Sequence, residues 1–142
     1  MMLAFGAALL APPALAADSA GPKEAAAAVP APPPGMGQVV FYRRPRVGTL
    51  ICCRVSEGFE AVNRLPHGMY FVQPATPGIH EYEIRSDLLR VEVKEGETQY
   101  VRCTIVAMGM ADLSLRDRVD FERHVRALDL LPPWTGETDK DD

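Results

Sequence analysis

The sequence lacks a long apolar run and lacks an excess of basic charge. Its 142 residues carry 15 Lys and Arg against 19 Asp and Glu, and residues 38–131 hold 13 of each sign. A nucleic-acid-binding domain normally shows a basic excess, and a transmembrane helix needs about 20 consecutive apolar residues. We therefore expect no nucleic-acid partner and no transmembrane span. With 47% apolar and 24% charged residues, the composition fits one globular domain.

The residue spacings typical of enzymes and metal sites are also missing. His67, His80 and His124 form no i, i+4 pair and are not accompanied by a C-x-x-C motif. No serine lies in a Gly-x-Ser-x-Gly context. We expect no catalytic residue, no metal and no cofactor, and predict that the protein is not an enzyme. His80 follows Pro-Gly at the start of a predicted strand, where we expect it to hydrogen-bond a neighbouring carbonyl.

Residues 1–16 are typical of a secretory signal peptide, because a short apolar run ends in two prolines and Ala14-Leu15-Ala16. No Lys or Arg precedes the run, so either the amino terminus supplies the positive charge or the true start lies upstream of Met1. We expect cleavage between Ala16 and Ala17 and a periplasmic or secreted protein. No cysteine occurs before Cys52, which excludes a lipoprotein anchor at this cleavage site.

Two segments predict flexible connections on either side of a domain at 38–131. Residues 17–37 contain five prolines and seven alanines without apolar periodicity, which favours an extended, disordered linker. Residues 132–142 open with two prolines and end in acidic residues, which predicts a flexible tail. Trp134 is the one residue of this tail that we expect to pack on the domain.

Period-two alternation dominates the chain from 38 to 107. Turn residues separate seven short runs at 39–42, 49–55, 59–65, 69–72, 79–85, 89–94 and 98–107. No helical run of crossover length separates them, which excludes a parallel α/β sheet. The pattern predicts a mainly β fold, an antiparallel β-sandwich of about seven short strands.

A helix is expected only after the strands, at 117–128. Phe121, Val125 and Leu128 share one helical face. Ser114, followed three residues later by Asp117, is the expected N-cap. We predict that this C-terminal amphipathic helix lies across a sheet or across one open end of the sandwich.

Several short motifs occur in a fixed order along the predicted strands. They are Gln38-Val39-Val40-Phe41-Tyr42-Arg43, Gly68-x-Tyr70, Pro77-Gly78-x-His80 and Gly96-Glu97-Thr98-x-Tyr100. The series resembles the DUF2846 family of small bacterial envelope or secreted domains of unknown function, and is similar to the PEGA modules, which are extracytoplasmic β-sandwiches. The resemblance covers roughly residues 37–107. It implies an envelope β-sandwich and supplies no catalytic residues.

The three cysteines leave two interpretations open. Alternation places Cys53 and Cys103 on the core face and Cys52 outside, with Arg102 facing water. Cys53 and Cys103 either form a disulfide, as an exported chain would allow, or are two small buried residues that never meet. Cys52 is then a free thiol or a site of intermolecular pairing.

Function is predicted only at the level of class. Arg43, Arg44 and Arg46 form a basic cluster beside a proline, either a solvated strand end or a partner surface for an acidic glycan or lipid headgroup. We expect a non-catalytic exported envelope module, with a binding or structural role toward an unidentified glycan or envelope protein. The alternative is a periplasmic redox-active thiol protein that uses Cys52 and Cys53.

Overall fold

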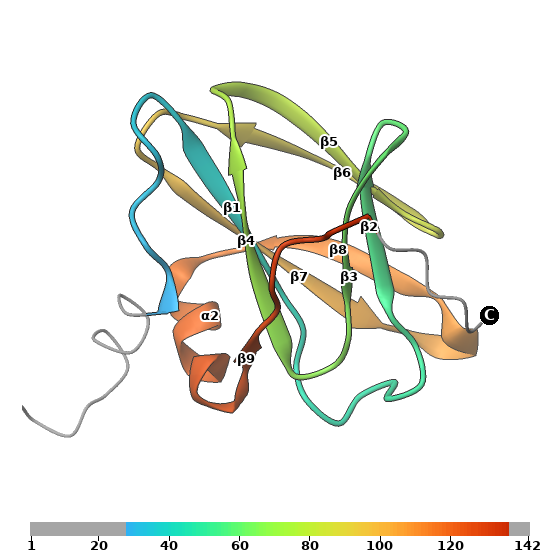
Figure 1. Ribbon diagram of the computed structural model, residues 1–142. Coiled ribbons are helices and arrows are strands. Elements are labelled where there is room, and N and C mark those ends of the chain that lie inside the picture. The colour runs from blue at the N-terminus through green and yellow to red at the C-terminus, as the bar shows by residue number, and fades with distance from the viewer. Residues whose placement is uncertain (1–27, 137–142) are drawn as a thin grey trace, which may run out of the picture.

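The computed structural model describes residues 28–136, which form two β-sheets packed face to face and one short helix (Figure 1). The predicted mainly β sandwich with a C-terminal helix is confirmed. The described residues contain nine strands, not about seven, and two of the strand pairs are parallel. The predicted signal peptide, the linker up to residue 27 and the tail after residue 136 lie outside the described residues.

The first sheet has five strands in the order β8 (Ala111–Arg116), β7 (Thr98–Ile105), β1 (Gly37–Tyr42), β4 (Met69–Ala75) and β9 (Asp129–Leu130). β1 is antiparallel to β4 and parallel to β7, and β9 is parallel to β4. Parallel neighbours need a long connection. The whole second sheet lies in the chain between β1 and β7, and it supplies this connection. The first sheet is therefore mixed, whereas the sequence predicted an antiparallel one.

The second sheet has four strands in the order β3 (Glu60–Leu65), β2 (Cys53–Glu57), β5 (Gly78–Ile84) and β6 (Asp87–Val93), all antiparallel. Its inward side chains meet those of the first sheet in the main core. The Phe41 ring lies 4.9 Å, centroid to centroid, from both Phe71 and Tyr82. Cys53 of β2 lies in this core, as the alternation predicted.

A second, smaller core covers the other face of the first sheet. The helix α2 (Arg118–His124) and the 3-10 turn η2 (Val125–Ala127) pack there. Phe121 is fully buried, with its ring 5.2 Å from Tyr42 and from Tyr100 and 5.6 Å from Tyr70. Because both faces of the sheet are covered, all six residues of β1 are buried.

The structure around α2 differs from three expectations. Arg102 does not face water: α2 covers it, and its Nη1 donates to both carboxylate oxygens of Asp120, at 3.1 and 3.3 Å. Ser114 is not the N-cap but a residue of β8; the N-cap is Asp117, whose side chain accepts from the Asp120 backbone N–H. The predicted helix at 117–128 consists of a short α-helix followed by a 3-10 turn.

The last residues of the predicted linker contact the domain. Ala28 and Val29 pack against the smaller core, the Tyr70 hydroxyl donates to the Ala28 carbonyl at 3.0 Å, and the Gln38 amide donates to the Pro30 carbonyl at 2.6 Å. Composition alone predicted an extended, solvated spacer here. The difference arises because the uncovered edge of this core accepts apolar side chains from the segment just before β1.

Candidate functional site

A groove opens where β2 and β5 separate. The two strands pair only through Ser56–Glu83 and Glu57–Tyr82, then diverge (Figure 1). The resulting space, of about 960 Å³, is closed at its far side by the 3-10 turn η1 (Ala107–Gly109) and the start of β8. We call it the β2–β5 groove.

The floor of the β2–β5 groove is apolar and belongs to the core. Cys53, Ile84 and Ala111 line it and are each less than 10% exposed. Ser86 joins the floor to the second sheet, because its hydroxyl donates to the Ala111 carbonyl at 2.7 Å and accepts from the Ala111 N–H at 3.1 Å. The groove therefore has a fixed base.

The rim carries three apolar side chains that are exposed to solvent. Leu50 is 98% exposed, Met108 95% and Met110 52%. Met108 has φ 65, in the left-handed region that a non-glycine residue rarely adopts. Exposed apolar patches mark protein or membrane interaction sites and ligand-binding grooves.

The charged residues of the groove are all basic. Arg54, Arg64 and Arg85 line it, and none of the described lining residues is acidic. Of these, Arg54 and Arg85 are exposed. A ligand that fits both the rim and Arg85 would combine apolar and acidic groups.

Arg43 does not belong to the predicted basic surface of Arg43, Arg44 and Arg46, because it is buried. Its side chain is only 1% exposed, and its guanidinium donates to four backbone carbonyls, those of Val47, Gly48, Ile51 and Leu65. A buried charge needs such partners. Arg43 is thus an internal support and not a partner contact.

The segment after Arg43 carries the groove's rim residue Leu50. Gly48 has φ 59, and a Cβ placed on it would lie 2.7 Å from Ile105 and 3.0 Å from the Arg43 guanidinium. Only a glycine fits so close an approach. Arg44 and Arg46 are exposed on this segment but do not line the groove; the Arg46 N–H donates to His67 Nδ1 at 3.2 Å.

Of the two interpretations of the cysteines, the structure contains the disulfide. Cys53 and Cys103 are bonded across the two sheets, with their Cα atoms 6.7 Å apart. Cys52 is free and exposed, and lies at the groove. Cys52 directly precedes β2, which begins at Cys53.

The histidines do not come together. Among the described residues, no group of three His, Cys, Asp or Glu could hold a metal ion. His80 Nε2 lies 2.7 Å from the Thr76 carbonyl, as its position predicted, and its Nδ1 lies 2.5 Å from Glu57. Burial alone would lower the pKa of His80, but the carbonyl and the Glu57 carboxylate outweigh it and raise that pKa.

A polar cluster joins the first sheet to α2. The Tyr42 hydroxyl donates to Asp120, which also pairs with Arg102. Burial alone would raise the pKa of the Asp120 carboxyl, but the Tyr42 hydrogen bond and the Arg102 charge hold it below its ordinary value. Burial, together with the Asp120 carboxylate, raises the pKa of Tyr42. Such a closed network is a structural link between sheet and helix.

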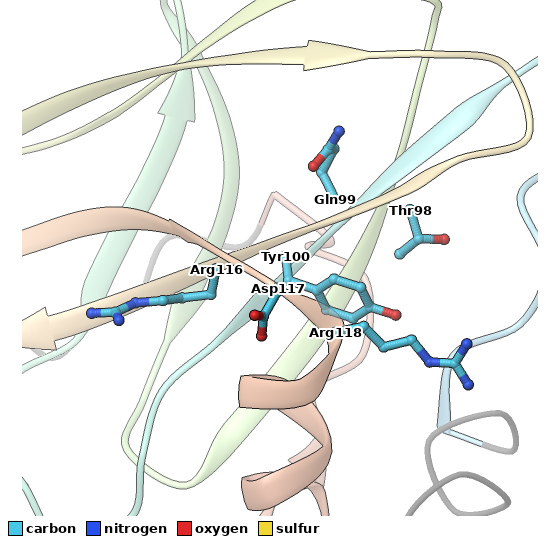
Figure 2. Close-up of a pocket in the computed structure, with 6 residues that line it drawn as sticks. All are labelled: Thr98, Gln99, Tyr100, Arg116, Asp117 and Arg118. Carbon is cyan, nitrogen blue, oxygen red and sulfur yellow. The ribbon is translucent and has the colours of Figure 1, made fainter.

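Two other hollows differ in character from the β2–β5 groove. One, of about 460 Å³, is polar and open; Tyr100, Arg116 and Arg118 line it at the start of α2 (Figure 2). The other, of about 630 Å³, is an apolar cleft between β3 and β4. Trp134 lines this cleft, and the Arg64 guanidinium lies 5.2 Å from its ring centroid, so Trp134 contacts the domain as predicted.

Sequence reasoning missed the groove's apolar rim. Leu50 falls within the predicted run at 49–55, and Met108 and Met110 carry no predicted role. The available signal was that Met108-Gly109-Met110 places two large apolar residues outside any period-two run. Their joint exposure depends on the paths of two distant loops, which local pattern does not encode.

Comparisons with known proteins assign no family. No family model matches the chain, and no curated protein matches it. Among solved structures, the N-terminal domain of AlgF from P. aeruginosa is similar, at 17% identity and a TM-score of 0.40, over 63% of this chain and 99% of that one. Within the described residues, no helix is long and apolar enough to cross a membrane.

Proposed function

We propose that the protein is a non-catalytic, exported module of the bacterial envelope that binds a protein partner through the β2–β5 groove. The observation that carries the proposal is the joint exposure of Leu50 and Met108 beside the arginines of the groove. Met and Arg are enriched at protein–protein interfaces. The resemblance to the DUF2846 family and the signal-like segment at 1–16 support the envelope location.

A protein partner accounts for the groove better than a glycan. Sugar-binding sites commonly stack an aromatic ring on the sugar and hydrogen-bond its hydroxyls through amides and carboxylates. The described lining residues of the β2–β5 groove include no aromatic side chain and no carboxylate. Large apolar side chains at its rim would instead lose water against apolar side chains of a polypeptide.

Site-specific photo-cross-linking tests the binding site. A photoreactive residue replaces Leu50, or replaces Phe59 in a matched control, because Phe59 is also fully exposed but lies outside the groove. Each mature protein is irradiated in an envelope extract. We expect a discrete cross-linked protein with position 50 and none with position 59, and expect Met108→Asp to abolish it. The same product from both positions, or none from position 50, would refute the proposal.

The proposed export of the protein is tested separately from partner binding. Mass spectrometry of the protein expressed in a bacterial host should find the mature N-terminus near Ala17, in the periplasmic or secreted fraction. An intact Met1 in the cytoplasmic fraction would contradict the proposed location. This result is independent of whether the groove binds a partner.

A redox function based on Cys52 is the second candidate, favoured by one observation: the exposed Cys52 directly precedes a disulfide-bonded cysteine. Thiol titration of the native protein discriminates between the two functions. A redox protein should show a Cys52 thiol that reacts at low pH, as a low-pKa thiolate does. Ordinary reactivity at Cys52, with Cys53 and Cys103 unreactive until reduction, would favour the binding module.

A further inference from the structure

We infer that the apolar cleft between β3 and β4 binds a small organic cation with an apolar body, such as an arylalkylammonium compound. We call this site the β3–β4 cleft. Among the described residues, none lines both this cleft and the β2–β5 groove, so the site is separate from the proposed partner site. Its volume of about 630 Å³ lies within the range of small-molecule sites, which is about 300–1,000 Å³.

The segment after β9 forms one wall of the β3–β4 cleft. This segment, red in Figure 1, runs from β4 toward β3. The Leu131 N–H donates to the Tyr70 carbonyl of β4 at 2.8 Å, and the Asn63 amide of β3 donates to the Pro132 carbonyl at 3.1 Å. The wall is therefore bonded to both sheets in the free protein. A ligand that enters a cleft already formed loses less free energy to ordering of the protein.

Most of the residues that line the cleft are apolar. Three strands and the segment after β9 contribute Val62, Phe71, Val72, Leu130, Leu131 and Trp134. The Trp134 side chain is half-buried, and Arg64, whose guanidinium lies 5.2 Å from its ring centroid, does not line the cleft. Apolar surface of a ligand would leave water against these side chains. The lining therefore favours an apolar ligand body.

Few amide groups of the cleft are free to bind a ligand. Both polar groups of the buried Asn63 side chain are engaged, because its nitrogen donates to Pro132 and its oxygen accepts from the Arg64 N–H at 2.8 Å. The Gln73 amide is half-buried, and no described residue hydrogen-bonds it. One free amide offers few partners to the many hydroxyls of a sugar, which argues against a glycan in this cleft.

The charged residues of the cleft are both acidic. Glu57 and Glu60 line it, and none of the described lining residues is basic. One Glu57 carboxylate oxygen lies 2.5 Å from His80 Nδ1, and 40% of the Glu57 side chain is exposed. Glu60 is exposed, and no described residue forms an ion pair with it. A carboxylate accepts hydrogen bonds and attracts positive charge. An ammonium group is therefore the complementary head group for the apolar body.

The fluorescence of Trp134 provides the assay, because this residue is the one tryptophan of the chain and it lines the cleft. The full mature protein is titrated with phenylbutylamine, phenylbutanol and phenylbutyrate. These probes share an aromatic body and differ in the charge of the head group. The titrations are made at low ionic strength, because salt screens exposed charges.

We expect phenylbutylamine to change the Trp134 emission saturably, phenylbutanol to bind about threefold to fivefold more weakly, and phenylbutyrate to bind more weakly still. A factor of about five corresponds to about 1 kcal/mol, the upper value for an exposed ion pair. Glu60→Lys should reverse the order, so that phenylbutyrate binds more tightly than phenylbutylamine. Glu92→Lys, the same charge change at an exposed residue outside the cleft, should leave the order unchanged.

Three results would overturn the inference: no saturable change with phenylbutylamine, equal affinities for phenylbutylamine and phenylbutanol, or equal effects of Glu60→Lys and Glu92→Lys. Because Glu60 is exposed, its replacement should leave the fold intact, which the unchanged Tm of Glu60→Lys would verify. The outcome is separable from that of the proposed function. If a partner cross-links at position 50 but phenylbutylamine does not bind, the β2–β5 groove remains the partner site and only the cation site is refuted.

Discussion

Replacement of Arg43 by methionine should destabilise the domain strongly, although an arginine next to Arg44 and Pro45 suggests a solvated position. The guanidinium donates to four carbonyls; its bond to Leu65 is buried, at 3.2 Å, and its bond to Val47 measures 2.8 Å. Methionine fills part of the volume but donates nothing. Hydrogen bonds from a charged group contribute roughly 1.5–3 kcal/mol each.

The expected loss is smaller than the sum of these bonds. The Val47, Gly48 and Ile51 carbonyls belong to part-buried contacts and regain water when the segment moves, whereas the Leu65 carbonyl stays enclosed. The buried charge also loses its own desolvation penalty on replacement. We therefore expect Arg43→Met to lower the free energy of unfolding by about 3 kcal/mol, within the range of buried-network substitutions.

Thermal and urea unfolding measure this change. In a domain of about 100 residues, 1 kcal/mol corresponds to roughly 4–8 °C in Tm, so Arg43→Met should lower Tm by more than about 10 °C. Arg44→Met is the matched control, because Arg44 is exposed; it should change stability by less than about 0.5 kcal/mol. Equal small effects of the two substitutions would refute the internal role of Arg43.

Three further predictions concern the disulfide between the sheets, the ion pair between β7 and α2, and the contacts of His80. Reduction of Cys53–Cys103, which spans a sequence separation of 50, should lower the free energy of unfolding by roughly 4 kcal/mol in the chain-entropy model; an unchanged urea midpoint after reduction would contradict it. Asp120→Asn should cost about 1–3 kcal/mol by removing the charge partner of Arg102. Because the pKa of Asp120 is lowered in the folded protein, its contribution to the free energy of unfolding is present above the ordinary value near 4. This contribution is lost as the pH falls through the folded pKa. A difference in Tm between wild type and Asp120→Asn that grows on acidification would contradict this. The pKa of His80 is raised in the folded protein, so its contribution to the free energy of unfolding is complete below about pH 6.5. This contribution is lost as the pH rises through the folded pKa. A difference in Tm between wild type and His80→Gln that persists unchanged at alkaline pH would contradict this.

Local pattern predicted the second sheet well because only one of its faces is buried. In β5, Tyr82 and Ile84 are buried while Ile79 and Glu81 are exposed, which fits the period-two alternation predicted for the run at 79–85. Period two carries information only when the two faces differ in environment. This condition holds wherever one side of a strand meets water.

The same reasoning fails for the first sheet because a later element, α2, covers its outer face. Arg102 sits at a position where alternation predicts water, but α2 brings Asp120 over it. The sequence of β7 contains no sign of this cover. The short β8 is absent from the predicted strands for a different reason: Ala111 and Leu113 do alternate, but Ser114, which lies in β8, is predicted to be the N-cap of the helix.

The groove could not be predicted because its parts are distant in sequence and its shape depends on a missing strand pairing. Nothing in the sequence of β2 or β5 shows that their ladder ends after Ser56–Glu83. The Cys53–Cys103 disulfide bonds β2 to the opposite sheet close to where the pairing of β2 with β5 ends. We therefore interpret the bridge as one cause of the separation that creates the groove.

In the proposed binding function, Arg43 acts through the rim of the groove and not by contact with the partner. It fixes the Val47–Ile51 segment, which carries Leu50 at the rim of the β2–β5 groove. A rim that is ordered in the free protein loses less conformational entropy when a partner binds. Arg43→Met should therefore weaken cross-linking at position 50 even below its unfolding temperature, where the protein is still folded. If folded Arg43→Met protein cross-links as efficiently as wild type, the rim is ordered by other contacts, and the role of Arg43 is limited to stability.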